Sequence, residues 1–391
     1  MVFSCISSWN VFLFDDNYTQ WFPVINSTYT RLFETGKINI WEMHLMNGIN
    51  ILDTGIYSIL NPFMLLSFII YRFLGLSNLI SIYIFIIVSL SMLVCNNIFK
   101  FYGICFRDRM ALVFCILGCS SYYKLGNWYY VFNNLFIGSM LIYYFFRVDN
   151  KFVKYFFAGG VLGFSIYMGN VQYTLMWYMF FSIVTIVMGI IFSKKYLLFM
   201  VTNELTAMLF SLPQIVLNAR ASASSTAFSG RNSSFFDYSL HLDNILVRGL
   251  IPECVINFFT NSQIEEYYFS NGFYFNGILA LSFFIAILFL IKGRKQQCHL
   301  KKLTIAYMAA IIFFVLYTLG KGFMVAEILS VLPVINRFRY LHKAYFILTP
   351  LLTVTMLYVY HESSPNLRSK LIWTGVCLSA INLVHIDIGG G

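Results

Sequence analysis

The sequence predicts an all-α, polytopic helical membrane protein, and three observations carry that prediction. Hydrophobic residues make up 59% of the 391-residue chain and charged residues only 11%, and the mean hydropathy is +0.73. Apolar runs recur at roughly the 20-residue length that a helix needs to cross a bilayer. Short polar stretches separate these runs, and every second stretch is basic. Such continuous apolar content argues against a soluble domain of this length.

The apolar runs predict about ten transmembrane helices. The second and third runs are short, and Gly126 and an aromatic cluster over 122–130 lie between them, so these two helices could be tilted or re-entrant. The expected spans are 79–97, 109–123, 133–147, 152–168, 172–193, 196–213, 274–292, 303–320, 340–360 and 370–388.

The net charge of +10 reports membrane topology. The basic residues do not form one patch but fall in alternate connections, as the positive-inside rule predicts for cytoplasmic loops. We therefore expect no nucleic-acid partner, and we place the chain in the cell membrane in contact with the lipid bilayer. The basic groups are Lys100, Arg107 and Arg109; Arg147, Lys151 and Lys154; Lys194 and Lys195; Lys292, Arg294, Lys295, Lys301 and Lys302; and Arg368 and Lys370.

The chain reads as a single membrane domain, 1–391, with two long external segments. The first external loop, 15–78, carries prolines and glycines that forbid one long helix, and we expect interfacial helices at 24–35 and 57–73. The second, 218–273, opens with a small polar run at 219–226 that favours flexibility. No signal peptide is expected, and the sequence reads as shortened at both ends.

Asp15 and Asp16 form an acidic pair at the external face of a chain that otherwise avoids charge. One interpretation is a solvated helix cap. The other is chemical: a general base, a metal ligand or the partner of a cation. Gln20 follows Asp16 by four residues, so its amide should lie on the same side of a helical turn. The eight cysteines show no metal-ligand or disulfide pattern.

Two further polar segments fall on the same expected face. Arg337, Arg339 and Lys343 bring three cations to the start of a span, where they could bind a phosphate or pyrophosphate or simply extend to the lipid headgroups. The segment 169–173, which contains Gln172, is a polar break between two spans and could be a plain helix–helix turn. The polar candidates therefore collect on one side of the membrane.

These segments, taken in order, resemble the YfhO family of bacterial polytopic membrane proteins, whose architecture is of the glycosyltransferase C type. The family opening is similar to Asp16, Thr19-Gln20 and Pro23, with Asp15 where glycine is usual. Further matches are Gly36, Trp41, Gly48, Tyr57 and Asn61-Pro62-Phe63; Gly169-Asn170-Val171-Gln172; Leu212-Pro213 with Ala219-Arg220-Ala221-Ser222; and Leu332-Pro333, Phe338-Arg339 and Lys343.

The resemblance implies a glycosyltransferase that moves a sugar from a polyprenyl-phosphate donor to a cell-envelope polymer acceptor on the outer face. Asp16 would be the catalytic base, with Asp15 in reserve, or the aspartate would help to hold a divalent cation. Arg337, Arg339 and Lys343 would bind the donor phosphate. Sugar or acceptor contacts would come from Gln20, Tyr18, Trp41 and Gln172, with Trp21 as a further stacking ring.

Three rival functions stay open. A transporter or flippase of lipid-linked glycans would use an ionisable residue inside a span, for which Glu204 is the main candidate. An envelope polysaccharide polymerase or ligase would rely on external arginines such as Arg220, Arg231 and Arg248. A non-enzymatic assembly partner would need neither set.

Overall fold

The computed structural model describes residues 16–38, 41–42, 49–76, 78–119, 128–146, 152–224, 277–292, 298–332 and 341–384, with residues 236, 239, 250 and 335. Within these ranges the fold is helical, apart from one two-residue antiparallel ladder. That ladder pairs β1 (Trp41–Glu42) with β2 (Ile49–Asn50), with Trp41 opposite Asn50. The all-α prediction is therefore confirmed for the described chain.

Each expected span coincides with a helix. The helices are α5 (Leu79–Phe101), α6 (Phe106–Leu117), α8 (Asn133–Phe146), α9 (Phe152–Phe164, extended by η3, Ser165–Met168), α10 (Val171–Ile191), α11 (Lys195–Ser224), α14 (Ile278–Ile291), α15 (Cys298–Thr318), α17 (Tyr345–Glu362) and α18 (Pro365–Val384). A shorter helix, α16 (Met324–Ser330), follows α15. Within the described ranges, four segments are long and apolar enough to cross a membrane: Leu79–Phe101, Val171–Ile191, Lys195–Arg220 and His299–Thr318.

The centre of the bundle is α17, which contacts α8, α14 and α15. All but one of its residues are buried, as expected for a helix that is apolar all round. Beside it, α9 packs closely on α11 through small residues. A Cβ added at Gly159 would lie 2.6 Å from the carbonyl oxygen of Asn203, and one at Gly163 would lie 2.4 Å from that of Ala207. Glycine is therefore required at both positions.

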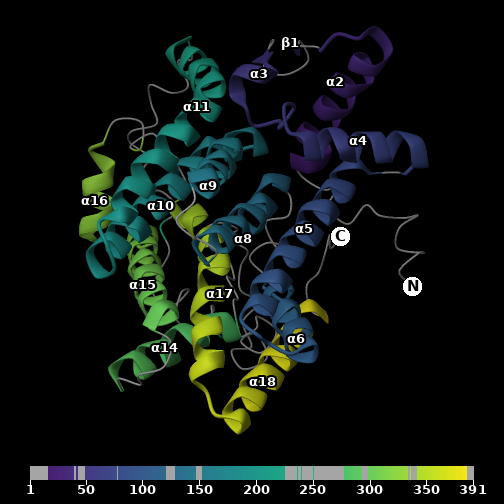
Figure 1. Ribbon diagram of the computed structural model, residues 1–391. Helices are drawn as coiled ribbons and strands as arrows, with labels where there is room; N and C mark the ends of the chain where they lie inside the picture. The colour runs from purple at the N-terminus through teal and green to yellow at the C-terminus, as the bar shows by residue number, and fades with distance from the viewer. Residues whose placement is uncertain are drawn as a thin grey trace.

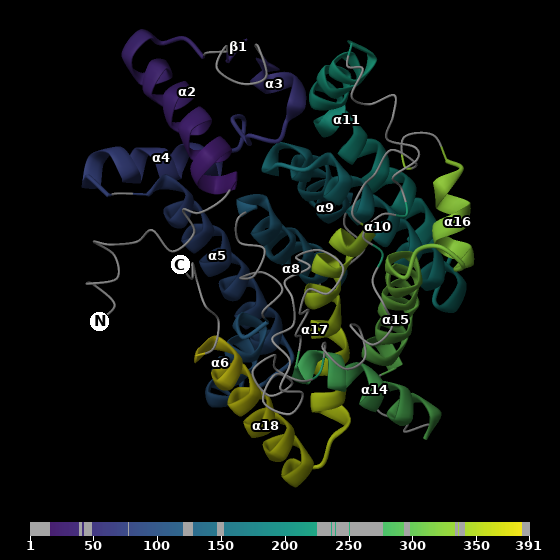
Figure 2. The same ribbon diagram turned by 180° about the vertical axis from the view of Figure 1, so that it is seen from behind.

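The expected interfacial helices are helical in the structure. The first is α2 (Phe22–Thr35), which follows a short π-helix, η1 (Asn17–Trp21). The second is α4 (Pro62–Leu74), which starts at the proline because Asn61 caps it. A short helix, α3 (Ile51–Thr54), lies between them in the sequence. Figures 1 and 2 show α4 on one side of the upper part of the molecule, below α2 and crosswise to α5.

Buried polar contacts join α2 to the chain ahead of α4. The Tyr29 hydroxyl of α2 donates a hydrogen bond to the carbonyl oxygen of Ile59 at 2.9 Å. Burial raises the pKa of Tyr29 above its usual value, so the hydroxyl stays a neutral donor. The two external helical segments are thus one packed unit.

Two expected boundaries differ from the structure: the second interfacial helix begins at Pro62 and not at residue 57, and α11 ends later than expected. Helix α11 continues to Ser224, so the first residues of the segment 218–273, including part of the small polar run at 219–226, are helical and not a flexible loop. The alanines of that run are good helix formers. Most of the remaining segment lies outside the described residues.

The two ends of α17 mark the two ends of the bundle. Its 18 residues rise by about 27 Å. Lys343 lies just before its start, and we call this end of the bundle the Asp16 end. Glu362 lies at its other end, which we call the Arg107 end. Two contacts bring basic connections to the Arg107 end: Tyr102 packs on His361, and Arg368 lies over Tyr360. Two further basic connections meet each other, because Lys302 lies over Phe192.

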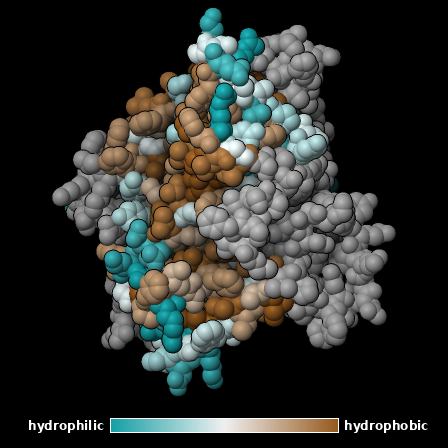
Figure 3. All heavy atoms as spheres, turned by 90° about the vertical axis from the view of Figure 1, so that its right-hand side faces the viewer, coloured by the Kyte–Doolittle hydropathy of each residue, from teal (hydrophilic) through white to brown (hydrophobic). Residues whose placement is uncertain are grey.

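The surface has the matching polarity. On the face that Figure 3 shows, apolar residues cover most of the described middle of the molecule, with hydrophilic residues toward the top and the bottom. Large apolar side chains such as Phe85, Leu93 and Phe106 are exposed. This exposure is what a lipid-facing surface requires, and it supports association with a bilayer.

Candidate functional site

The carboxylate of Asp16 is held by two side-chain donors at the Asp16 end of the bundle. The amide nitrogen of Gln20 donates to Oδ1 at 3.2 Å, and the indole nitrogen of Trp128 donates to Oδ2 at 2.8 Å. The first contact confirms the expected pairing of residues four apart. Asp16 precedes η1, but its side chain makes no capping bond to the backbone, so Asp16 is not the side-chain cap of this helix.

Trp128 is held in position by residues next to it in the sequence. It immediately precedes η2 (Tyr129–Phe132). The backbone N–H of Tyr129 donates to Asn17 Oδ1 at 3.3 Å, and the Tyr129 hydroxyl lies 2.7 Å from the carbonyl oxygen of Ile56 and 2.9 Å from Ser58 Oγ. Asn17 is fully buried. These bonds fix the indole against the start of η1.

Lys343 lies over the ring face of the same indole, that of Trp128. Its Nζ is 4.6 Å from the centre of the Trp128 ring, and the residue is only 5% exposed. A buried ammonium over a tryptophan face is attracted by the ring quadrupole, by about 2 kcal/mol when desolvated. Two of the residues that the sequence singled out, Asp16 and Lys343, are thus brought together by a third.

An aromatic wall continues from Trp128 to the turn before α10. The Trp128 ring stacks on Tyr130 with 8° between the planes, and Tyr130 lies 6.2 Å from Tyr173 between ring centres. Gly169, at φ 133°, passes so close that a Cβ there would lie 2.6 Å from Tyr130 Cβ. The segment 169–173 therefore lies against the same wall as Asp16 and Lys343.

Gln172 is buried in this turn. Asn170 caps α10 by accepting from the Gln172 backbone N–H at 2.8 Å, as in an ordinary helix–helix turn. The Gln172 amide nitrogen, however, is buried and makes no hydrogen bond within the described part of the chain. A buried donor of this kind is costly unless a partner reaches it, so Gln172 stays a candidate contact for a bound group.

A buried polar network lies beneath the wall. The Tyr83 hydroxyl donates to Asn133 Oδ1 at 2.6 Å and accepts from the Asn61 amide at 2.8 Å. The Asn133 amide donates in turn to the carbonyl oxygen of Met168. The network joins α5, α8, the start of α4 and η3, which lie directly beneath the elements that carry the site.

The other expected site residues differ in their exposure and in whether the structure describes them. Tyr18 is 61% exposed and Gln20 is half-buried beside Asp16, so both face the surface next to the carboxylate. Trp21 is only 5% exposed and packs edge-on against Tyr57, so its expected role as a sugar-stacking ring is wrong. Trp41 is described only by its backbone pairing. Asp15, Arg337 and Arg339 lie outside the described residues.

The described residues give little support for a divalent cation. Within the described ranges, no three His, Cys, Asp or Glu side chains come together in a group that could hold a metal ion. The Asp16 oxygens accept hydrogen bonds from the Trp128 indole N–H and from the amide nitrogen of Gln20. We therefore derive no step through a metal.

The sequence did not reveal the role of Trp128. The aromatic cluster 122–130 was visible, but its position between two spans indicated only an irregular connection. A tryptophan that donates to a carboxylate far away in the sequence leaves no local spacing to detect. Asn17, which holds Tyr129, was missed for the same reason.

Comparisons of the chain with protein-family models, curated proteins and solved structures gave no match. The resemblance to the YfhO family therefore stays a prediction that rests on the motifs themselves.

Proposed function

We propose that this chain is a membrane glycosyltransferase of the YfhO type, with a glycosyltransferase C-like bundle of about ten spans and its site on the outer face. The observation that supports it best is the Asp16 carboxylate, oriented by Trp128 and Gln20 at the bundle end that also carries Lys343 and the exposed ring of Tyr18. An oriented carboxylate beside a cation is what base-assisted transfer from a phosphate donor requires.

In this proposal Asp16 takes the proton of the acceptor hydroxyl. The hydroxyl oxygen then bonds to the anomeric carbon of the sugar while the bond from that carbon to the phosphate oxygen breaks. The electron pair leaves with the polyprenyl phosphate. General-base assistance of this kind contributes about 10²–10⁴ in rate.

The leaving phosphate gains negative charge, which nearby cations stabilise. Lys343 supplies one at the site, and Arg337 and Arg339 are expected from the sequence to supply two more. Trp128 has a positioning role: its N–H fixes the carboxylate, and its ring face holds Lys343 close to it. Tyr18 is exposed beside Asp16 and offers a ring on which a sugar could stack.

The deciding experiment measures transfer of a labelled sugar from a polyprenyl phosphate by membranes that contain the protein. Asp16→Asn should lower the rate by about 10²–10⁴. Asp53→Asn, which removes a carboxylate from the same external region, should leave it unchanged. Undiminished transfer by Asp16→Asn would refute the assignment of the base.

The sidedness of the proposal has its own test. A cysteine replacing the exposed Tyr18 should react with a membrane-impermeant maleimide in intact cells, whereas one replacing Lys370 should react only after the cells are opened. The unaltered chain, which has exposed Cys105 and Cys377, gives the background. Labelling in the reverse order would place Asp16 in the cytoplasm and refute an outer-face site.

A second candidate, a transporter of lipid-linked glycans, is favoured by one contact. Glu204, within the apolar helix α11, is paired with the Ser182 hydroxyl of α10. That hydroxyl also lies 2.9 Å from the carbonyl oxygen of Tyr178. Ionisable residues inside spans often mark transport paths. If Glu204→Gln abolishes function while Asp16→Asn preserves it, the transporter is the better account.

A further inference from the structure

A groove of about 210 Å³ opens between α6 and α18 at the Arg107 end, far from Asp16. Arg107 and Asp108 of α6 and Ser369 of α18 form its polar end, and Ala111, Phe114 and Val376 line its apolar part. We call it the α6–α18 groove. It takes no part in the proposed transfer reaction.

The two helices run in the same direction and meet above the groove. The Asn382 amide of α18 donates to the carbonyl oxygen of Gly118, just past α6, at 2.8 Å. A Cβ added at Gly118 would lie 2.2 Å from Ser379 Cβ. The groove therefore lies on the Arg107 side of the contact between Gly118 and Ser379.

The polarity of the groove follows the helix axes. Positions 107, 111 and 114 share one face of α6, and positions 369, 372, 373 and 376 share one face of α18. From Arg107 to Phe114 the helix rises by about 10 Å, and over that distance the lining changes from charged to apolar. Trp373, which is 56% exposed, lies on the lining, where tryptophans are typical of a membrane interface. A charged head followed by an apolar body is the shape of a lipid.

The charges of the groove favour an anionic head. Asp108 is only 8% exposed, and its carboxylate accepts from the Tyr360 hydroxyl at 2.8 Å and from Arg107 Nε at 3.3 Å. The Arg107 side chain is 76% exposed. Further described charges close to the starts of α6 and α18 are the carboxylate of Glu362 and the cations of Lys100, Arg109, Arg368 and Lys370.

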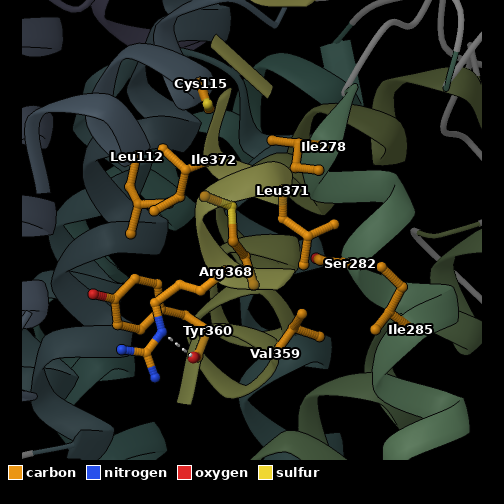
Figure 4. Close-up of a pocket in the computed structure, with 11 residues that line it drawn as sticks. Leu112, Cys115, Ile278, Ser282, Ile285, Val359, Tyr360, Arg368, Leu371 and Ile372 are labelled. Atoms are coloured by element: carbon orange, nitrogen blue, oxygen red, sulfur yellow. Dashed lines mark hydrogen bonds between the residues drawn. The ribbon is translucent and has the colours of Figure 1, made fainter. Parts of the chain in front are cut away.

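The arginine nearest to the groove on α18 is already engaged. Arg368 Nε donates to the carbonyl oxygen of Tyr360 at 3.0 Å, and its guanidinium lies 4.2 Å from the centre of the Tyr360 ring. Figure 4 shows it at the edge of an apolar cavity between α6, α14, α17 and α18. That cavity holds about 20 Å³, room for little more than one water. Arg107 is the cation among the described lining residues of the groove, and although its Nε pairs with Asp108, its side chain is exposed enough to meet a headgroup as well.

We propose that the α6–α18 groove binds an anionic glycerophospholipid. Its phosphate contacts the Arg107 guanidinium and the Ser369 hydroxyl, and an acyl chain lies along Ala111, Phe114 and Val376 beside Trp373. The phosphate replaces water on an exposed arginine, and the chain covers apolar surface. The proposal does not depend on the function of the Asp16 site.

The test uses the full chain in phosphatidylcholine nanodiscs that contain increasing fractions of phosphatidylglycerol with brominated acyl chains, which quench tryptophan. The Trp373 signal is the difference between the parent and Trp373→Phe. Half-maximal quenching should need about tenfold more brominated lipid in Arg107→Gln, which corresponds to about 1.4 kcal/mol. Arg72→Gln removes an equal charge from α4 at the opposite end and should change nothing.

Two further arms keep the test decisive. Ala111→Phe fills the groove without altering charge and should abolish the quenching. In the parent, phosphatidylglycerol without bromine should displace the brominated lipid at lower fractions than phosphatidylcholine without bromine does. This measurement needs no variant. Equal displacement by the two lipids, or equal weakening by Arg107→Gln and Arg72→Gln, would overturn the proposal.

Discussion

Asp16 and Lys343 contact the same indole, that of Trp128, from two different sides. The indole N–H donates to the Asp16 carboxylate at 2.8 Å, while the Lys343 ammonium lies 4.6 Å from the ring centre. A carboxylate and an ammonium are thereby held near each other without a direct ion pair in the described structure. The indole fixes the relation between the two charges.

Trp128→Phe should separate the two roles of the indole. Phenylalanine keeps a ring face for Lys343 but loses the N–H that orients Asp16. Because hydrogen bonds to charged groups contribute about 1.5–3 kcal/mol, we expect sugar transfer to fall by about tenfold or more. The same substitution at Trp373, at the other bundle end, should not affect transfer. Equal rates in the two variants would show that Trp128 has no positioning role.

Lys343→Met should weaken the use of the lipid-linked donor. Methionine keeps most of the side-chain length and removes the charge, so the KM for the donor should rise more than kcat falls, and Lys343→Arg should restore much of the loss. Lys321→Met, which removes an exposed cation at the same bundle end, is the matched control. An unchanged KM together with a lowered melting temperature would assign Lys343 to packing alone.

The buried network around Tyr83 should be strongly coupled. Tyr83→Phe leaves the Asn61 amide and Asn133 Oδ1 without that hydroxyl, so the free energy of unfolding should fall by about 1–3 kcal/mol. In the double variant Tyr83→Phe with Asn133→Leu, the loss in free energy of unfolding should be smaller than the sum of the two single losses. The difference should be about 0.5 kcal/mol or more. Thermal unfolding in detergent measures this, with Tyr71→Phe in α4 as a control. Additive losses would contradict the network.

Stability should fall in mild acid because of His361. Burial first, and then the Arg368 guanidinium, lower the pKa of His361 below its ordinary value, and its Nε2 is buried with no hydrogen-bond partner in the described structure. The unfolded chain therefore takes up this proton at a higher pH than the folded protein does.

Neutral His361 makes its full contribution to the free energy of unfolding above the pKa that it has in the unfolded chain, near 6.5. It is lost as the pH falls from there toward the lower folded value. Melting temperatures measured from pH 8 to pH 5 should drop less for His361→Gln than for the parent. Parallel curves for the two proteins would refute this account.

Local patterns were enough to find most helices and one contact of the site. Apolar runs predicted the spans because each transmembrane helix must satisfy its own backbone and expose apolar side chains. The Gln20–Asp16 bond was foreseen because side chains four residues apart meet on a helical turn. The boundary at 218 failed because good helix formers continued α11 through a run that also reads as flexible.

Sequence by itself determined that this is a helical membrane protein, that its basic connections alternate, and that Asp16 and Lys343 belong together at one face. Those properties follow from hydropathy and charge, which act along the chain. Only the tertiary structure decided what joins the two residues and which aromatics are exposed: Trp128 lies between them, whereas Trp21 is buried. Contacts between distant segments depend on how helices pack, and packing leaves no periodic signal in the sequence.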